Sequence, residues 1–248
     1  MKFILSNGTQ LEMKSAEFKP ATQAENEFRW READAYLFDI DGTLIVTRDL
    51  VHWNALHQAM LEVYGVNATI EGIPYHGKTD LGILRAALAR AGVQGAAFEA
   101  NLSQALDVVC REVHANASGI VADVCPAIHG LLVSLKSAGK LVGVASGNLE
   151  SVGWQKIEAA GLRQFFSFGC FSNSCELRAE IFRNAIAETH HQLGSAAKVC
   201  FIGDTPEDIR AARAASAHII AVGTGTYSYD ELQALTPDLC ISSCAELI

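Results

Sequence analysis

The stretch of the sequence best suited to chemistry is a pair of carboxylates at the end of a short apolar run. Asp39 and Asp41 follow residues 35–38, which have the composition of a buried strand. Alternate side chains of a strand share a face, so the two carboxylates start out on the same side. Gly42 lets the backbone turn sharply and come close to a ligand. Two carboxylates at a strand end suit a divalent cation and a transferring phosphoryl group.

A second acidic pair follows another apolar run, residues 199–202. Thr205 suits a helix N-cap and Asp208 suits the positive end of a helix, so capping accounts for the residues after Asp204. Capping does not account for Asp204 itself, which is an acid at the mouth of a buried strand. Asp204 and Asp208 are therefore the second group of candidate site residues.

Both acidic segments resemble signatures of one family. The pattern D-x-D-G-T at 39–43 resembles the first motif of the haloacid dehalogenase-like superfamily, most of whose members are phosphohydrolases. The pattern G-D-x-x-x-D at 203–208 resembles the last motif of that superfamily and comes in the expected order. An ordinary Asp-Gly turn is the alternative for the first segment taken alone.

The resemblance implies a role for each acid. Asp39 is expected to be the nucleophile that forms an aspartyl-phosphate, and Asp41 the general acid and base. Mg²⁺ is expected to be held by Asp39, the backbone carbonyl of Asp41 and Asp204. Asp208 is also expected to belong to the metal site, where it orients Arg178 or metal-bound water. Four carboxylates around a phosphate would repel it, so a dication and a guanidinium are needed there.

Weaker motifs suggest the remaining contacts. Ser146, after the strand-type run 141–145, fits the second motif, in which a hydroxyl and the next backbone N–H bind phosphoryl oxygens. Arg178 is the candidate for the basic third motif, although the commoner form is Lys-Pro, and Lys140 and Lys156 are its rivals. An ordinary turn and a solvated arginine are the alternatives. The expected phosphate and substrate contacts are Gly42, Thr43, Gly147, Asn148 and Lys78.

Residues 49–121 have helical periodicity. Apolar spacing predicts helices around 56–63, around 81–88 with Thr79 or Asp80 as N-cap, and around 98–109. The insertion resembles the small mobile cap of the phosphoglycolate phosphatase-like branch, in which a G-x-T-D loop like 77–80 is common. Lys78 in that loop either meets the distal end of a substrate or is a plain exposed lysine. Minor candidates of the same kind are Arg48, His52 and Trp53.

The chain from Pro126 onward alternates helices and strands. Strands are predicted at 141–145, 165–171, 199–202 and 218–222, with helices at about 178–192 and 206–215 among those that separate them. This alternation predicts an α/β fold. It has a doubly wound (Rossmann-like) parallel sheet core, and its site lies at the carboxyl ends of the strands. A small α-helical cap domain is inserted after the first core strand. The predicted domains are an N-terminal extension (1–33), the core (34–48 and 122–248) and the cap (49–121).

The N-terminal extension is polar and mixed. A short strand is predicted at 3–5, and Phe28 and Trp30 are expected to rest on the core. The apolar core of the first residues is too short for a secretory signal.

Composition narrows the class of protein further. The 248 residues carry a net charge of −9, which disfavours nucleic acid and anionic membranes as partners. Seven scattered cysteines form no C-x-x-C pair, so reduced thiols and a cytoplasmic location are expected. No apolar run reaches membrane-spanning length.

The sequence thus predicts a Mg²⁺-dependent phosphomonoester hydrolase acting on a small phosphorylated metabolite. A phosphomutase of the same superfamily uses the same aspartates, and a non-catalytic relative would keep the metal site without turnover. A dehalogenase would not need an acid at position 41, and a receiver-type signalling domain is about half this length and has no cap.

Overall fold

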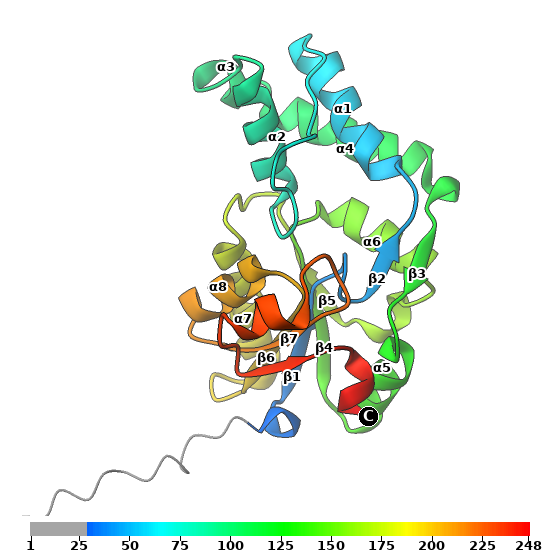
Figure 1. The fold of residues 1–248 in the computed structure, drawn as a ribbon, viewed down its shortest axis with the longest axis vertical. Coiled ribbons are helices and arrows are strands. Elements are labelled where there is room, and N and C mark those ends of the chain that lie inside the picture. Colours follow the sequence, from blue (N-terminus) through cyan, green and yellow to red (C-terminus); the bar gives the residue numbers. More distant parts are fainter. Residues whose placement is uncertain (1–28) are drawn as a thin grey trace, which may run out of the picture.

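The computed structural model describes residues 29–248 (Figure 1), so the strand predicted at 3–5 and the contact predicted for Phe28 lie outside the described residues. Its centre is a six-stranded parallel sheet with the strand order β5-β4-β1-β6-β7-β8. The strands are β1 (Ala35–Phe38), β4 (Leu141–Ala145), β5 (Phe168–Cys170), β6 (Val199–Gly203), β7 (His218–Val222) and β8 (Leu239–Ile241). The predicted doubly wound sheet is confirmed.

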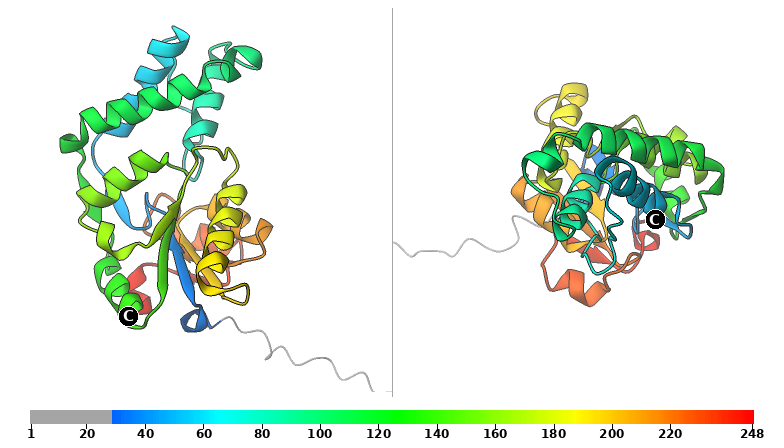
Figure 2. Two further views of the ribbon diagram at one scale, coloured as in Figure 1. Left: turned by 180° about the vertical axis from the view of Figure 1, so that it is seen from behind. Right: turned by 90° about the horizontal axis from the view of Figure 1, so that it is seen from above.

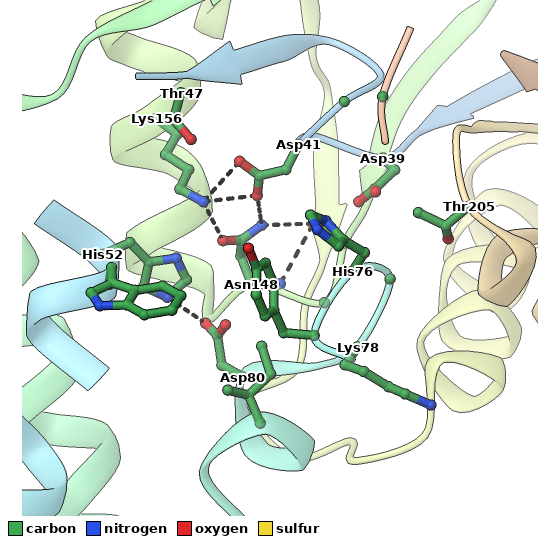
Figure 3. Close-up of a pocket in the computed structure, with 18 of the residues that line it drawn as sticks. Asp39, Asp41, Thr47, His52, His76, Lys78, Asp80, Asn148, Lys156 and Thr205 are labelled. Carbon is green, nitrogen blue, oxygen red and sulfur yellow. Dashed lines mark hydrogen bonds and ion pairs between the residues drawn. The ribbon is translucent and has the colours of Figure 1, made fainter. Parts of the chain in front are cut away.

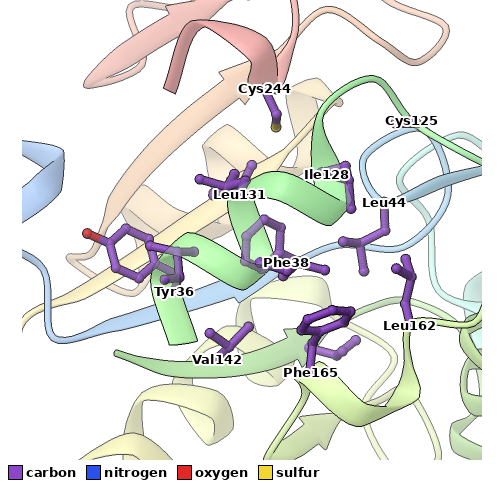
Figure 4. Close-up of a cluster of buried hydrophobic side chains, with 14 of the residues drawn as sticks. Tyr36, Phe38, Leu44, Cys125, Ile128, Leu131, Val142, Leu162, Phe165 and Cys244 are labelled. Carbon is purple, nitrogen blue, oxygen red and sulfur yellow. The ribbon is translucent and has the colours of Figure 1, made fainter. Parts of the chain in front are cut away.

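Helices cover both faces of this sheet. One face carries α5 (Ile128–Ser137) and α6 (Glu150–Ala159), and the other carries α7 (Arg178–Leu193), α8 (Pro206–Ala214) and α9 (Tyr229–Gln233). Side chains of β1 alternate between the two layers. Tyr36 and Phe38 enter the cluster under α5 (Figure 4), and Leu37 enters the opposite cluster. Because β1 is buried on both faces, its sequence is uninterrupted apolar.

The predicted strand at 165–171 is shorter in the structure. Residues 163–165 form a 3-10 turn, and only residues 168–170 pair with β4. Phe165 and Phe166 instead pack into the core cluster beside α5. An apolar run in the sequence does not show whether its residues form a strand or pack into the core from a turn. The 3-10 helices within residues 29–248 are η2 (Trp30–Glu32), η3 (Ala117–Gly119), η4 (Arg163–Phe165) and η5 (Cys244–Leu247).

A helical cap stands over the carboxyl end of the sheet (Figures 1 and 2). Its helices are α1 (Val51–Tyr64), α2 (Asp80–Arg90), α3 (Ala96–Glu99) and α4 (Leu102–Ala115). The helix predicted over 98–109 is interrupted, because Phe98 belongs to the separate turn α3. Thr79 caps α2 as predicted, its hydroxyl accepting a hydrogen bond from Gly82 N at 3.1 Å.

Two connections join the cap to the core. The antiparallel strands β2 (Ile45–Thr47) and β3 (Ala122–Val124) lie side by side, and Arg48 N donates to Val121 O at 2.9 Å. The chain therefore leaves and re-enters the core at one place, which suits a hinge. On this ground we propose to keep 49–121 as the bounds of the cap.

Residues near the described N-terminus pack on the core. Trp30 lies edge-on to Tyr36 with ring centroids 6.2 Å apart, and its carbonyl accepts a hydrogen bond from the Tyr36 hydroxyl. All seven cysteines lie within the described residues and are free. None of the helices within residues 29–248 has both the length and the apolar character needed to cross a membrane.

Candidate active site

Three neighbouring strands end at the site. Asp39 follows β1, Ser146 follows β4 and Asp204 follows β6, and β1 lies between the other two strands. Parallel register brings the three strand ends to one edge, where Asp39 N donates to Ile202 O at 2.9 Å. This edge is the switch point of the sheet, where ligands of such folds bind.

Asp39, Asp204 and Asp208 form a buried cluster of acids. Each offers an oxygen within 4.8 Å of the others. Arg178, the first residue of α7, reaches into the cluster, with Nη2 at 2.8 Å from Asp39 Oδ2 and 2.6 Å from Asp208 Oδ1. The side chain of Arg178 is 7% exposed, so it is not a solvated surface arginine. Three carboxylates thus face a single guanidinium.

Burial and crowding raise the proton affinity of two of these acids. Burial raises the pKa of Asp39 to about 6, with Asp208 and Asp41 adding to the rise and Arg178 opposing it. Burial also raises the pKa of Asp204 well above its ordinary value, and the charges of Asp39 and Asp208 add to this effect. The ionised carboxylates of this cluster are destabilised by burial and by one another. A divalent cation would stabilise them, and their oxygen atoms are suitable ligands for it.

The Asp204 carboxylate is held by a tight backbone cradle. A Cβ atom added at Gly42 or Gly225 would collide with this carboxylate, so both positions need glycine. The Thr43 hydroxyl donates to Asp204 Oδ1 at 2.9 Å, and the Thr224 hydroxyl donates to Gly42 O at 2.6 Å. Thr43, expected from the sequence to contact substrate, is fully buried and positions Asp204 instead.

Asp41 belongs to a separate network that sequence reasoning missed. Lys156 Nζ lies 2.9 and 2.7 Å from the two Asp41 carboxylate oxygens and 2.9 Å from Asn148 Oδ1 (Figure 3). Asn148 Nδ2 lies 2.8 Å from Asp41 Oδ2 and 3.0 Å from Ser146 Oγ. Lys156 is 6% exposed at its side chain, so its ammonium is committed to this pair. Lys140, its rival in the sequence, precedes β4 at the opposite end of the sheet.

The pKa of Asp41 moves opposite to that of Asp39. Burial raises the pKa of Asp41, but the Lys156 ammonium and the hydrogen bonds from Lys156 and Asn148 outweigh burial and leave it below the ordinary value. Two carboxylates one residue apart are therefore tuned in opposite directions, which is the usual sign of divided roles in catalysis.

The loop before α2 closes the cap onto the site. Arg178 Nη1 donates to Gly77 O at 3.2 Å, Asp80 N donates to Gly147 O at 2.8 Å, and Leu149 N donates to Asp80 Oδ2 at 2.7 Å. A Cβ at Gly147 would collide with the Lys78 carbonyl, so glycine permits this close approach. The cap and the core meet here through backbone contacts.

Lys78, expected to meet the distal end of a substrate, lines the cavity and is paired with an acid of the core. Lys78 Nζ lies 3.1 Å from Glu207 Oε1 on α8, and its side chain points away from Asp41 and Asn148 (Figure 3). The pair is partly exposed and lies across the seam between cap and core. Of the expected contacts, four line the cavity at the site: Gly42, Lys78, Gly147 and Asn148.

A cavity of about 480 Å³ lies between the cap and the carboxyl end of the sheet. Asp39, Asp41, Asp204 and Arg178 line its core side, and residues of the hinge, α1 and the loop before α2 are among those that line its cap side. This volume suits a small molecule. The fold and the site define a doubly wound α/β protein with buried aspartates at the switch point, beneath a helical cap.

Residues 36–222 match the family model of haloacid dehalogenase-like hydrolases, and the chain belongs to that family. No curated protein sequence matches the chain.

Solved structures share the fold at low identity. CbbY from Rhodobacter sphaeroides, in complex with phosphate, is 21% identical, with a TM-score of 0.66 over 87% of this chain and 96% of that chain. A predicted phosphoglycolate phosphatase from Haemophilus somnus is 18% identical, with a TM-score of 0.61 over the same shares. A β-phosphoglucomutase from Clostridium difficile is 19% identical, with a TM-score of 0.62 over 87% and 93% of the two chains.

Proposed function

We propose that the protein is a Mg²⁺-dependent phosphomonoester hydrolase that acts on a small phosphorylated metabolite through an aspartyl-phosphate. The observation that carries this proposal is the position of Asp39. Its buried carboxylate follows the central strand, pairs with Arg178 at 2.8 Å and faces a cavity that the cap covers. CbbY, which has the same fold, is described with phosphate and with xylulose-(1,5)-bisphosphate, which supports a phosphorylated substrate.

Mg²⁺ would be held by the carboxylates of Asp39 and Asp204 and by the backbone carbonyl of Asp41. When bound, it would offset charge on these acids and on the phosphoryl oxygens. Asp208 is engaged otherwise, because its Oδ2 accepts hydrogen bonds from Thr205 N and Oγ1 while Oδ1 faces Arg178. We therefore assign Asp208 to orienting Arg178.

The reaction proceeds in two steps. An Asp39 oxygen attacks phosphorus, the ester P–O bond breaks, and the leaving alkoxide takes a proton from Asp41. Water then attacks the phosphorus of the aspartyl-phosphate, and Asp41 takes a proton from that water. The P–O bond to Asp39 breaks, which restores the Asp39 carboxylate and releases inorganic phosphate. Arg178 and Ser146 stabilise the charge on the equatorial phosphoryl oxygens in both steps.

Asp41 is in its basic form in this arrangement, because Lys156 and Asn148 stabilise the ionised carboxylate. That form is the one needed to activate water. Donation to a leaving group requires Asp41 to gain a proton and to loosen its pair with Lys156. We assign Lys156 as a positioning residue for Asp41.

Phosphate release from a panel of phosphomonoesters tests the function. The proposal expects release that needs Mg²⁺, stops on chelation and is lost in Asp39→Asn. Formation of an isomeric ester without phosphate would identify a phosphomutase, a function suggested by the fold of β-phosphoglucomutase. Binding of Mg²⁺ without turnover on any ester would identify a non-catalytic relative.

A further inference from the structure

The permanently charged cations that line the cavity are all paired with acids of the described chain. Lys156 is bound to Asp41, Arg178 to Asp39 and Asp208, and Lys78 to Glu207. These three are the only lysines and arginines among the cavity-lining residues of the described part of the chain. Arg178 is assigned to the transferring phosphoryl group, so none of the three is free for a second anion.

The two histidines of the cavity do not supply a free positive charge either. His52 Nε2 lies 3.2 Å from Asp80 Oδ2, so any charge on its ring is matched by that carboxylate (Figure 3). His76 lies beside Thr226 Oγ1, at 3.2 Å from Nδ1. Burial lowers the pKa of His76, with the charge of Asp41 opposing, so the neutral ring is favoured at pH 7.

The cap side of the cavity also presents apolar and aromatic side chains, which have no charge to be matched. Trp53 and Tyr75 line it and meet edge to face, with ring centroids 5.8 Å apart. Two hinge residues that line the same cavity keep apolar surface exposed: Leu50 is 62% exposed and Val46 is 39% exposed. Apolar side chains that line a cavity favour an apolar part of a ligand, since contact removes apolar surface from water.

We propose that the preferred substrates are phosphomonoesters of uncharged alcohols, whose alkyl or aryl part packs against Trp53, Tyr75 and Leu50. A second phosphate or a carboxylate on the leaving group would enter a cavity with no unpaired cation and several acids, and its desolvation would go uncompensated. This inference rests on the proposed function and names the substrate class of the same site.

Matched esters test the substrate class. We would compare kcat/KM for butyl phosphate, 2-phenylethyl phosphate, the ω-carboxylate analogue of butyl phosphate, and butane-1,4-diol bisphosphate, all with Mg²⁺. The two uncharged leaving groups should exceed the two anionic ones by about tenfold or more. Equal or faster turnover of the anionic esters would overturn the inference and leave the phosphatase function intact.

Variants of two cavity-lining residues, Trp53 of the cap and Leu50 of the hinge, sharpen the test. Trp53→Ala should remove most of the preference for 2-phenylethyl over butyl phosphate. Leu50→Lys should raise the relative kcat/KM of the carboxylate analogue about fivefold or more, because it places a cation at an exposed lining position. Leu61→Lys is the matched control. Leu61 is 50% exposed on the neighbouring helix α1 and does not line the cavity.

Turnover of acetyl phosphate separates the proposed phosphatase function from the proposed substrate class. It is a small acyl phosphate with a good leaving group. Its turnover therefore depends on the core residues at the strand ends and little on cap residues such as Trp53. Unchanged acetyl phosphate turnover shows that a variant is folded and active. An unaltered ester preference in both active variants would overturn the inference. Absence of phosphate release from every compound, acetyl phosphate included, would instead refute the proposed function.

Discussion

The two halves of the cavity are built in different ways. The core half consists of charged side chains that follow parallel strands or lie in the first turn of the next helix. They are paired with one another, as in the contacts of Arg178 with Asp39 and Asp208. The cap half combines aromatic and aliphatic side chains such as Trp53 and Tyr75 with polar side chains, among them the pair of His52 and Asp80. The contrast indicates a division of labour. Under the proposed function, the core half would be needed for any phosphoryl transfer, while the cap half would decide which alcohol is accepted.

The largest expected effect comes from the centre of the core half. Asp39→Asn should lower kcat/KM by about 10⁴-fold or more on every substrate, because an amide cannot form the aspartyl-phosphate. Phosphate release with thermal unfolding as a fold check measures it. Asp34→Asn, at the opposite end of β1, is the control. Substantial turnover by a well-folded Asp39→Asn protein would break the assignment of chemistry to the core half.

Arg178→Ala should lower kcat/KM by about 10²- to 10³-fold, comparable to the loss of one preorganised donor at a transition state. The fold decrease in kcat/KM should be similar for acetyl phosphate and butyl phosphate, since the guanidinium acts on the phosphoryl group. Arg183→Ala is the matched control, because Arg183 is exposed on the same helix. Unchanged kinetics in Arg178→Ala would contradict the role given to the ion pair with Asp39.

Lys156→Met tests the network around Asp41. We expect a loss of about tenfold on butyl phosphate and a smaller loss on acetyl phosphate, which needs less help in protonating its leaving group. Without the Lys156 charge the pKa of Asp41 rises, so the limb of the pH–rate profile that Asp41 controls should move to higher pH.

The controls for Lys156→Met come from the same region of the chain. Lys156→Arg should recover part of the activity. Lys140→Met should leave kcat/KM unchanged on both substrates. Equal losses on both substrates, with an unmoved pH profile, would reduce Lys156 to a structural residue.

The smallest expected effect is on stability without metal. Burial raises the pKa of Asp204 in the folded state, so its ionised form destabilises that state, and the free energy of unfolding falls as pH rises through the folded pKa. In chelator at pH 8, Asp204→Asn should therefore raise the free energy of unfolding. The gain should shrink toward pH 4.5.

Urea unfolding at the two pH values measures this difference. Added Mg²⁺ should then stabilise the wild type more than Asp204→Asn, because the variant lacks a carboxylate ligand. Destabilisation of metal-free Asp204→Asn at pH 8, or equal stabilisation of both proteins by Mg²⁺, would contradict a metal site at this cluster.

The sequence predicts the core half better than the cap half for a physical reason. Asp39 and Asp204 directly follow apolar strands, and parallel pairing brings such strand ends together whatever the details of side-chain packing. Arg178 also begins its helix as expected. The sheet, most of the helices and the N-cap at Thr79 depend on similarly local patterns.

Other features depend on where distant side chains meet. Lys156 lies within a helix, and nothing in its local sequence shows that its ammonium reaches Asp41. Thr43 and Lys78 turn toward Asp204 and Glu207, residues far along the chain. The glycine-rich segment after the strand at 218–222 was the available signal for the cradle around Asp204, since Gly225 has to leave space for that carboxylate.

Detection of the covalent intermediate tests the central claim most directly. The protein would be quenched in acid during turnover of acetyl phosphate with Mg²⁺, and its peptides weighed by mass spectrometry. Asp41→Asn would be run in parallel, since loss of the base that activates water slows breakdown of the intermediate. Our account predicts one added phosphoryl group on Asp39 in both proteins, with more in Asp41→Asn, and none in Asp39→Asn or in chelator. Turnover with no phosphoryl group on Asp39, or with one on another residue, would contradict it.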